Sequence, residues 1–145
     1  MQFVTGGAFN GKSSWVRAYN QINEDNSSWL SAYSQDILPV SLDHFEKRMV
    51  VIEGIEQWVK EWLTELDPEV VLEKWHALLE IWCMWERADQ GRWVILIGSD
   101  ITKGIVPSEA ENRVWRDVAG RIFQDTASIC SRVDLIWYGI NKRLK

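Results

Sequence analysis

The stretch Gly-Gly-Ala-Phe-Asn-Gly-Lys-Ser near the start of the chain constrains the fold more than any other feature. It occupies residues 6–13 and fits the pattern G-x-x-x-x-G-K-[ST], which is typical of a loop that binds phosphate groups. Such a pattern is meaningful between a strand and a helix. Here an extended run, residues 2–5, precedes it, and a helix-permissive run, residues 14–19, follows it. This strand–loop–helix unit predicts an α/β fold.

Each residue type in the loop has a physical reason. Backbone N–H groups at the start of a helix point at phosphate oxygens, and the helix dipole favours negative charge there. Gly6 and Gly11 permit a tight wrap that a β-carbon would obstruct. Lys12 can reach the β- and γ-phosphates of a nucleoside triphosphate, and Ser13 can ligate Mg²⁺. The expected nucleotide-binding residues are Gly6, Gly7, Ala8, Phe9, Asn10, Gly11, Lys12 and Ser13.

Apolar extended runs alternate with helical runs along the remainder of the chain. Residues 49–52 and 93–97 are continuously apolar, which is typical of strands covered on both faces in a parallel sheet. Residues 55–66 and 68–88 carry apolar side chains at helical spacing, and the second run is rich in Trp. The alternation predicts a three-layer α/β fold with a mostly parallel sheet of about five strands, in a single domain over residues 1–145. The expected strands are 2–5, 29–33, 49–52, 93–97 and 135–138, and the expected helices are 14–19, 55–66, 68–88 and 108–132, with a short helical turn at 43–47 and a basic tail at 139–145.

The last expected helix, residues 108–132, has a recognisable start and a polar stripe. Ser108 and Glu111 have the spacing of a capping box. Four residues repeat at i, i+4, i+7 and i+11, so they share one narrow stripe of the helix. The stripe is either a solvated face or part of a site or a subunit contact. Its members are Arg113, Asp117, Gly120 and Gln124.

Charge and composition argue against several classes of function. The net charge is −5, and no basic stripe marks a surface for nucleic acid. The longest apolar runs, such as residues 93–97, are too short to cross a membrane. The chain enters its first expected strand almost at once, without the basic and apolar regions of a secretory signal, so we expect a cytoplasmic protein. Cys83 and Cys130 lie far apart and are expected to be buried free thiols.

Two acidic side chains follow apolar strands and are the best candidates for chemistry. In an open α/β sheet, ligands bind at the carboxyl ends of the strands. Glu53 follows the run 49–52, and Asp100 follows the run 93–97. Phosphoryl transfer needs a carboxylate to hold Mg²⁺ through water or to orient the acceptor hydroxyl, so both are expected to be catalytic together with Lys12. Either carboxylate could instead serve only as a helix cap.

The two histidines give weaker signals. His76 lies in the Trp-rich run and is expected to be structural. His44 precedes the run 49–52 and could face the site, but a histidine without a placed partner is a weak indication of chemistry.

Further stretches complete a pattern that one enzyme family shares. Residues 3–8 read Phe-Val-Thr-Gly-Gly-Ala and run into Gly-Lys-Ser. Residues 104–107 read G-I-V-P, and residues 116–124 fit R-D-x-x-G-x-x-x-Q. The Ser-Gln pair at 34–35 and the end of the chain, residues 135–139 with their lysine-rich tail, agree with the same pattern. Together these motifs resemble the adenosylcobinamide kinase / adenosylcobinamide-phosphate guanylyltransferase family.

The resemblance implies a RecA-like P-loop fold and a kinase of cobalamin biosynthesis that assembles as a trimer. Such a kinase uses a nucleoside triphosphate, ATP or GTP, to phosphorylate the aminopropanol hydroxyl of adenosylcobinamide, a corrinoid. By the same resemblance, Ser13 and Glu53 are the expected Mg²⁺ ligands, and residues 104–107 are part of the site. The sequence does not choose between ATP and GTP.

The chain also departs from that family at several positions. Phe9 and Asn10 stand in place of Arg-Ser, Asp100 in place of Glu, and Phe123 in place of Asn. The stretch between the Ser-Gln pair and Glu53 is much shorter than in the bifunctional enzymes, which carry there the histidine that receives GMP. We therefore expect kinase activity in preference to guanylyl transfer. Two alternatives are a regulatory or assembly paralogue, with the Trp-rich helix as its partner surface, and a kinase for a different small hydroxyl substrate.

Overall fold

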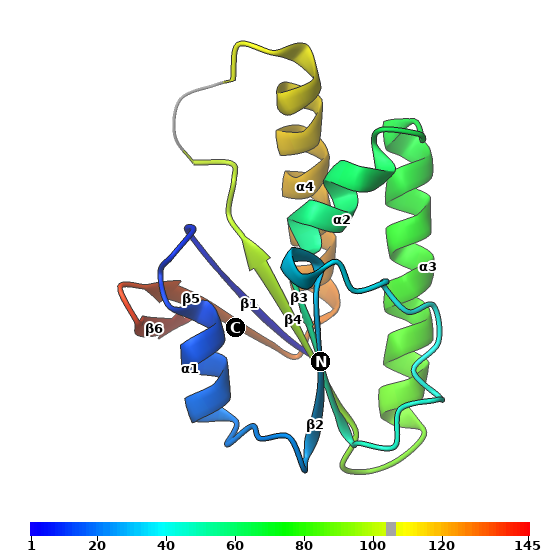
Figure 1. The fold of residues 1–145 in the computed structure, drawn as a ribbon, viewed down its shortest axis with the longest axis vertical. Coiled ribbons are helices and arrows are strands. Elements are labelled where there is room, and N and C mark those ends of the chain that lie inside the picture. Colours follow the sequence, from blue (N-terminus) through cyan, green and yellow to red (C-terminus); the bar gives the residue numbers. More distant parts are fainter. Residues whose placement is uncertain (104–106) are drawn as a thin grey trace.

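A six-stranded sheet forms the centre of the molecule (Figure 1). The computed structural model describes residues 1–103 and 107–145. The strand order is β2-β3-β4-β1-β5-β6, and every neighbouring pair is parallel except β5 and β6. The strands are β1 (Gln2–Gly6), β2 (Ser27–Ser31), β3 (Met49–Glu53), β4 (Trp93–Ser99), β5 (Arg132–Trp137) and β6 (Ile140–Arg143).

Helices cover both faces of this sheet, which gives three layers. Helix α1 (Lys12–Tyr19) lies on one face, whereas α2 (Ile55–Trp62), α3 (Pro68–Arg87) and α4 (Ala110–Ile129) lie on the other (Figure 1). Successive strand residues point to opposite faces. Phe3 therefore joins the large core beneath α2, α3 and α4, and Val4 packs with Val16 of α1. The expected α/β fold with a mostly parallel sheet is confirmed.

The Trp-rich helix α3 contributes to the larger core. Trp75 and Trp82 are fully buried, and their rings pack edge to face with centroids 5.6 Å apart. The indole N–H of Trp75 donates a 2.9 Å hydrogen bond to the hydroxyl of Thr126 in α4. Aromatic side chains buried in this way are large contributors to core stability. Because the protein's own sheet and α4 cover these rings, they are not an open partner surface.

Most of the expected basic tail forms a sixth strand, β6, in addition to the about five strands that the sequence predicts. Tyr138 and Gly139 have φ of 51° and 75°, which suits a two-residue turn of type I′ between antiparallel strands. Across this turn Trp137 lies opposite Ile140. All four residues of β6 are exposed, which explains why no apolar pattern marks the strand.

The two ends of α4 also differ from the expected helix. The helix begins at Ala110, and the hydroxyl of Ser108 bonds the side chain of Glu109 instead of capping the helix. It ends at Ile129 because Cys130 takes an extended conformation with ψ of 139°. The proposed capping box was therefore wrong, and Arg132, expected in the helix, begins β5.

Two segments between β2 and β3 differ from the structure that the sequence predicts. Residues 43–47 are not a short helix; the Phe45 N–H donates a 3.1 Å bond to the Leu42 carbonyl and closes a turn. Strand β2 ends at Ser31, and a 3-10 turn, Ala32–Ser34, follows it. Tyr33, expected inside the strand, thus lies beyond its carboxyl end.

The carboxyl ends of β1, β4 and β3 meet at one edge of the sheet. Gly6 lies opposite Ser99, and the N–H of Asp100 donates a 2.9 Å hydrogen bond to the Gly6 carbonyl. Glu53 lies opposite Ile97. The phosphate loop and the ends of the two acidic strands are therefore neighbours. Among the described helices, none is long and apolar enough to cross a membrane.

Candidate active site

The loop of residues 6–13, which we call the phosphate loop, wraps around the amino end of α1. Phe9 and Gly11 have φ of 58° and 83°, so the loop turns through left-handed conformations. A Cβ on Gly6 would lie 2.2 Å from the carbonyl oxygen of Ile136, so only glycine fits there. In the described structure no side chain caps the start of α1, which leaves its first N–H groups available to an anion.

The hairpin turn between β5 and β6 braces the phosphate loop. The N–H of Gly139 donates a 2.9 Å hydrogen bond to the Asn10 carbonyl, and the N–H of Tyr138 donates a 3.1 Å bond to the Asn10 side chain. Asn10 also closes the loop on itself through its own N–H, 3.4 Å from the Gly7 carbonyl. The turn that joins β5 to β6 therefore contacts the phosphate loop through hydrogen bonds from its backbone N–H groups.

Lys12 folds back over the loop. Its ammonium donates a 2.9 Å hydrogen bond to the Gly7 carbonyl, and the residue is only 8% exposed. Burial lowers the pKa of Lys12, although the charges of Glu56 and Glu53 act in the opposite direction. A phosphate oxygen is a stronger partner for this cation than a neutral carbonyl, because charge-assisted hydrogen bonds are stronger.

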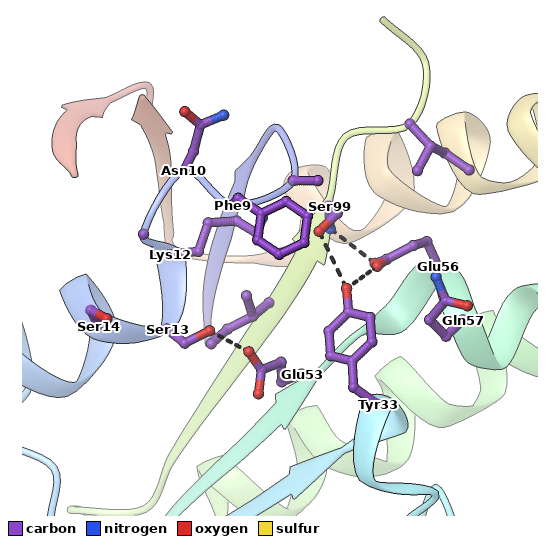
Figure 2. A pocket seen from close by; sticks show the side chains of 14 residues that line it. Phe9, Asn10, Lys12, Ser13, Ser14, Tyr33, Glu53, Glu56, Gln57 and Ser99 are labelled. Atoms are coloured by element: carbon purple, nitrogen blue, oxygen red, sulfur yellow. Dashed lines mark hydrogen bonds between the residues drawn. The ribbon is translucent and has the colours of Figure 1, made fainter. Parts of the chain in front are cut away.

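Ser13 at the start of α1 and Glu53 at the end of β3 are in direct contact. The Ser13 hydroxyl donates to one Glu53 carboxylate oxygen (Figure 2). The other oxygen accepts a 2.8 Å hydrogen bond from the indole N–H of Trp29 in β2. Trp29 is itself stacked against Arg17 of α1, with the guanidinium carbon 3.7 Å from the ring centroid. Sequence reasoning did not find Trp29.

A second glutamate, Glu56 in the first turn of α2, was also missed. It is 1% exposed, and its carboxylate accepts hydrogen bonds from the Tyr33 hydroxyl and, at 2.9 Å, from the Ser99 N–H. The Oγ of Ser99 lies 3.3 Å from the Tyr33 hydroxyl, so contacts join the three residues in a triangle (Figure 2). The sequence does carry a signal for Glu56. It is an acidic residue in the first turn of a helix that directly follows a strand, which is where sites form in such sheets.

Asp100 takes a different position from the other two carboxylates. It accepts hydrogen bonds from the N–H and, at 2.6 Å, the hydroxyl of Thr102, and it lies 3.5 Å from the Lys103 ammonium. Burial disfavours its charge, but the Thr102 bonds and Lys103 outweigh burial and lower the pKa of this carboxyl. Asp100 is thus occupied with its own loop and does not line the cavity beside Lys12.

A cavity of about 520 Å³ lies over this edge of the sheet, a size that suits a small-molecule ligand. One wall is the phosphate loop and the start of α1. The other comes from the 3-10 turn after β2, the ends of β3 and β4, and the first turn of α2. Apolar and polar groups are mixed in its lining. The residues around it are Ala8, Phe9, Asn10, Gly11, Lys12, Ser13, Ser14, Tyr33, Glu53, Glu56, Gln57, Ile97, Ser99 and Ile101.

Both histidines lie outside the cavity. His44 is exposed and packs beside Phe45 with ring centroids 4.1 Å apart. Nearby, the Lys47 ammonium bonds the carbonyls of Glu24 and Asp25, which precede β2, so this segment lies toward the amino ends of the strands. The idea that His44 faces the site was therefore wrong. His76 is 2.8 Å from Asp125 on the surface of α3 and α4.

The polar stripe of α4 lines a separate hollow of about 530 Å³ rather than the cavity beside Lys12. Arg116 reaches from it to the Thr102 carbonyl, and Arg113 bonds the carbonyl of Pro107 at 3.0 Å. Of the G-I-V-P motif, residues 104–106 lie outside the described part of the chain. Arg113 of the stripe therefore contacts the last residue of this motif, and Arg116 beside the stripe contacts a residue that precedes it.

A parallel sheet with a phosphate loop after β1, and with β4 inserted between β1 and the strand that ends in Glu53, defines a P-loop NTPase-like α/β protein. The family model for cobinamide kinase / cobinamide phosphate guanyltransferase matches residues 24–144. The chain belongs to this family of enzymes of cobinamide metabolism, as its motifs indicated. The matched range starts after the phosphate loop, so loop and family match are independent observations. No curated protein matches the chain.

Proposed function

We propose that this protein is a nucleoside-triphosphate-dependent kinase of cobalamin biosynthesis that phosphorylates adenosylcobinamide. The observation that carries the proposal is the meeting of Lys12, Ser13 and Glu53 at one cavity, in a chain of this family. Loop N–H groups, an ammonium and a hydroxyl–carboxylate pair are what a triphosphate and its metal ion require. A cytoplasmic enzyme that forms a trimer is part of the proposal, by family resemblance.

Ser13 and Glu53 are the proposed ligands of Mg²⁺, directly or through water. Mg²⁺ takes oxygen ligands and needs only one or two from the protein, because water and phosphate oxygens complete its shell. The contact between the Ser13 hydroxyl and the Glu53 carboxylate supplies such oxygens at one place. Within residues 1–103 and 107–145, no group of three or more His, Cys, Asp or Glu side chains could hold a metal alone. Bound Mg²⁺ would neutralise charge on the phosphates.

Phosphoryl transfer in such a site depends on positioning and electrostatics, so no activated nucleophile is needed. The phosphate loop would hold the triphosphate through the N–H groups at the start of α1. Lys12 would stabilise the negative charge that spreads over the transferring group. Burial of its ammonium strengthens this interaction, since water screens it less.

We do not extend the proposal to guanylyl transfer. That reaction needs a nucleophile within reach of the nucleotide, and His44 is exposed on a segment at the other end of the strands. Asp100 was expected to be catalytic, but we do not assign it a catalytic step, because its carboxylate accepts a hydrogen bond from Thr102 and does not line the cavity.

The test is incubation of the purified protein with Mg²⁺, adenosylcobinamide and ATP or GTP labelled at the γ-phosphate. Transfer of label to the cobinamide is the expected result, and comparison of the two nucleotides decides which is used. Nucleotide binding without transfer to any cobinamide would favour the regulatory or assembly paralogue instead. A parallel incubation with α-labelled GTP tests guanylyl transfer, and covalent labelling that is lost in His44→Ala would contradict our exclusion of it.

A further inference from the structure

Tyr33 and Glu56 line the cavity, and the proposed function does not assign either of them to triphosphate binding. Glu56 is 1% exposed, and a carboxylate buried to this degree loses hydration that its hydrogen bonds must replace. Tyr33 is 54% exposed, yet its hydroxyl donates to this hidden carboxylate. The pair therefore connects an open face of the cavity with a buried acid. A buried acid in a cleft beside a nucleotide-binding loop is a candidate for chemistry.

The backbone around the pair fits the Tyr33 ring closely. Gly54, between β3 and α2, has φ of 89°, and a Cβ there would meet the side chains of Ala32 and Tyr33 at 3.1 and 3.2 Å. Glycine therefore lets the ring lie against the chain. On the other side, the indole N–H of Trp115 in α4 bonds the Glu56 carbonyl. The 3-10 turn, the start of α2 and helix α4 thus hold the Tyr33 hydroxyl and the Glu56 carboxylate in contact.

Tyr33 and Glu56 line the same cavity as Lys12 and Glu53. The charges of both glutamates oppose the lowering of the Lys12 pKa by burial. Lys12 is the group expected at the transferring phosphate. Across the cavity, Tyr33 and Glu56 therefore lie near the place where an acceptor must attack.

We infer that Tyr33 binds the acceptor hydroxyl and that Glu56, acting through Tyr33, receives its proton. This inference rests on the proposed kinase function and assigns the acceptor side of that same site. The Tyr33 oxygen can accept a hydrogen bond from an alcohol while its own proton is donated to Glu56. Burial and the Glu56 hydrogen bond raise the pKa of Tyr33, so the phenol stays protonated and retains this donor role.

The proton of the acceptor hydroxyl leaves through Tyr33 and Glu56 while the phosphoryl group is transferred. The acceptor oxygen forms a bond to the γ-phosphorus as the bond from that phosphorus to the β,γ-bridging oxygen breaks, which leaves a nucleoside diphosphate. The acceptor proton moves to the Tyr33 oxygen while the Tyr33 proton moves to the Glu56 carboxylate. Glu56 then returns its proton through Tyr33 to water, so one proton is released for each phosphate transferred.

The experiment compares kcat, KM and nucleotide affinity of Glu56→Gln and Tyr33→Phe with the wild type, using adenosylcobinamide as acceptor. In Glu56→Gln the amide can keep the bond from the Ser99 N–H but cannot take a proton, so kcat should fall ~100-fold. Tyr33→Phe removes the hydroxyl, and kcat should fall at least ~10-fold. In both variants the KM and the Kd for the nucleotide should stay within about twofold of the wild-type values. A merely structural role would change nucleotide binding together with kcat.

Matched controls are Glu80→Gln on the exposed face of α3 and Tyr19→Phe at the end of α1, which should leave kcat unchanged. Variants of Tyr33 and Glu56 with wild-type kcat would overturn the inference while the kinase function stands. Lower thermal stability with weaker nucleotide binding, and no separate loss of kcat, would overturn it in favour of a structural role. If Glu56→Gln does not fold, the kcat and nucleotide affinity of Tyr33→Phe test the inference alone. A wild-type protein that transfers no phosphate would overturn the proposed function, and this inference with it.

Discussion

The indole N–H of Trp29 donates a 2.8 Å hydrogen bond to the carboxylate of Glu53. Trp29 lies in the edge strand β2 and Glu53 ends the neighbouring strand β3, so the bond crosses between two strands. The Ser13 hydroxyl holds the other oxygen of the same carboxylate. Both Glu53 oxygens thus have a hydrogen-bond donor, and such bonds would orient the carboxylate for the Mg²⁺ that we propose it binds.

Trp29→Phe should therefore raise the Mg²⁺ concentration needed for nucleotide binding. The ring can still stack on Arg17, but one Glu53 oxygen loses its donor, and loss of such an outer partner typically costs ~10-fold in metal affinity. Titration of Mg²⁺ at fixed nucleotide measures the effect. Trp93→Phe, which alters an indole on the same face of the sheet at its amino end, is the control. Equal Mg²⁺ dependence in both variants would contradict an orienting role for Trp29.

Lys12→Ala should weaken nucleotide binding without weakening the fold. Removing the only lysine of the phosphate loop takes a charged partner from the phosphates, and we expect the Kd for ATP or GTP to rise ~10- to 100-fold. The variant loses the bond to the Gly7 carbonyl, but it also removes an ammonium whose charge burial disfavours, as the lowered pKa of Lys12 indicates, so the free energy of unfolding should change little. Calorimetric titration and urea unfolding measure the two quantities. Lys47→Ala, at the other end of the strands, should leave the Kd unchanged.

Much of the sheet could be predicted because its strands are buried on both faces. Continuous apolar runs at 49–52 and 93–97 leave few alternatives to interior parallel strands, and both are found, as β3 and β4. Strand β6 carries no such mark, since an exposed hairpin strand needs only backbone pairing and a turn that Tyr138 and Gly139 can form. The strand order depends on contacts between distant segments, which no local pattern contains.

The same division applies to the site. The phosphate loop and Glu53 could be predicted, because loop chemistry and the end of a strand are local properties. Trp29 and Tyr33 could not, because their roles depend on β2 pairing with β3 and on the 3-10 turn after β2. Phe123 stood out as a departure from the family motif; in the fold its ring packs against Phe3 with centroids 5.2 Å apart, so it is a core residue.

Gly54→Ala should destabilise the protein more than Gly139→Ala. Both glycines have left-handed φ, 89° and 75°, so alanine is strained at each by ~1 kcal/mol. A Cβ at Gly54 also meets the Ala32 and Tyr33 side chains, whereas a Cβ at Gly139 meets nothing within 4 Å among the described atoms. We expect the free energy of unfolding to fall by about 2–3 kcal/mol for Gly54→Ala and about 1 kcal/mol for Gly139→Ala. Urea unfolding measures both, and equal losses would show that the Tyr33 contact is loose.

Cys130 should resist thiol reagents in the folded protein. It is fully buried, and burial raises the pKa of Cys130 to about 12, so almost no reactive thiolate forms at pH 8. In a Cys83→Ser variant, which leaves this single thiol, reaction with Ellman's reagent at pH 8 should be slow and limited by unfolding. Urea above the unfolding midpoint should release one equivalent at once. Rapid reaction in native buffer would contradict this prediction. It would mean that the end of α4 unfolds locally and exposes Cys130 to the reagent.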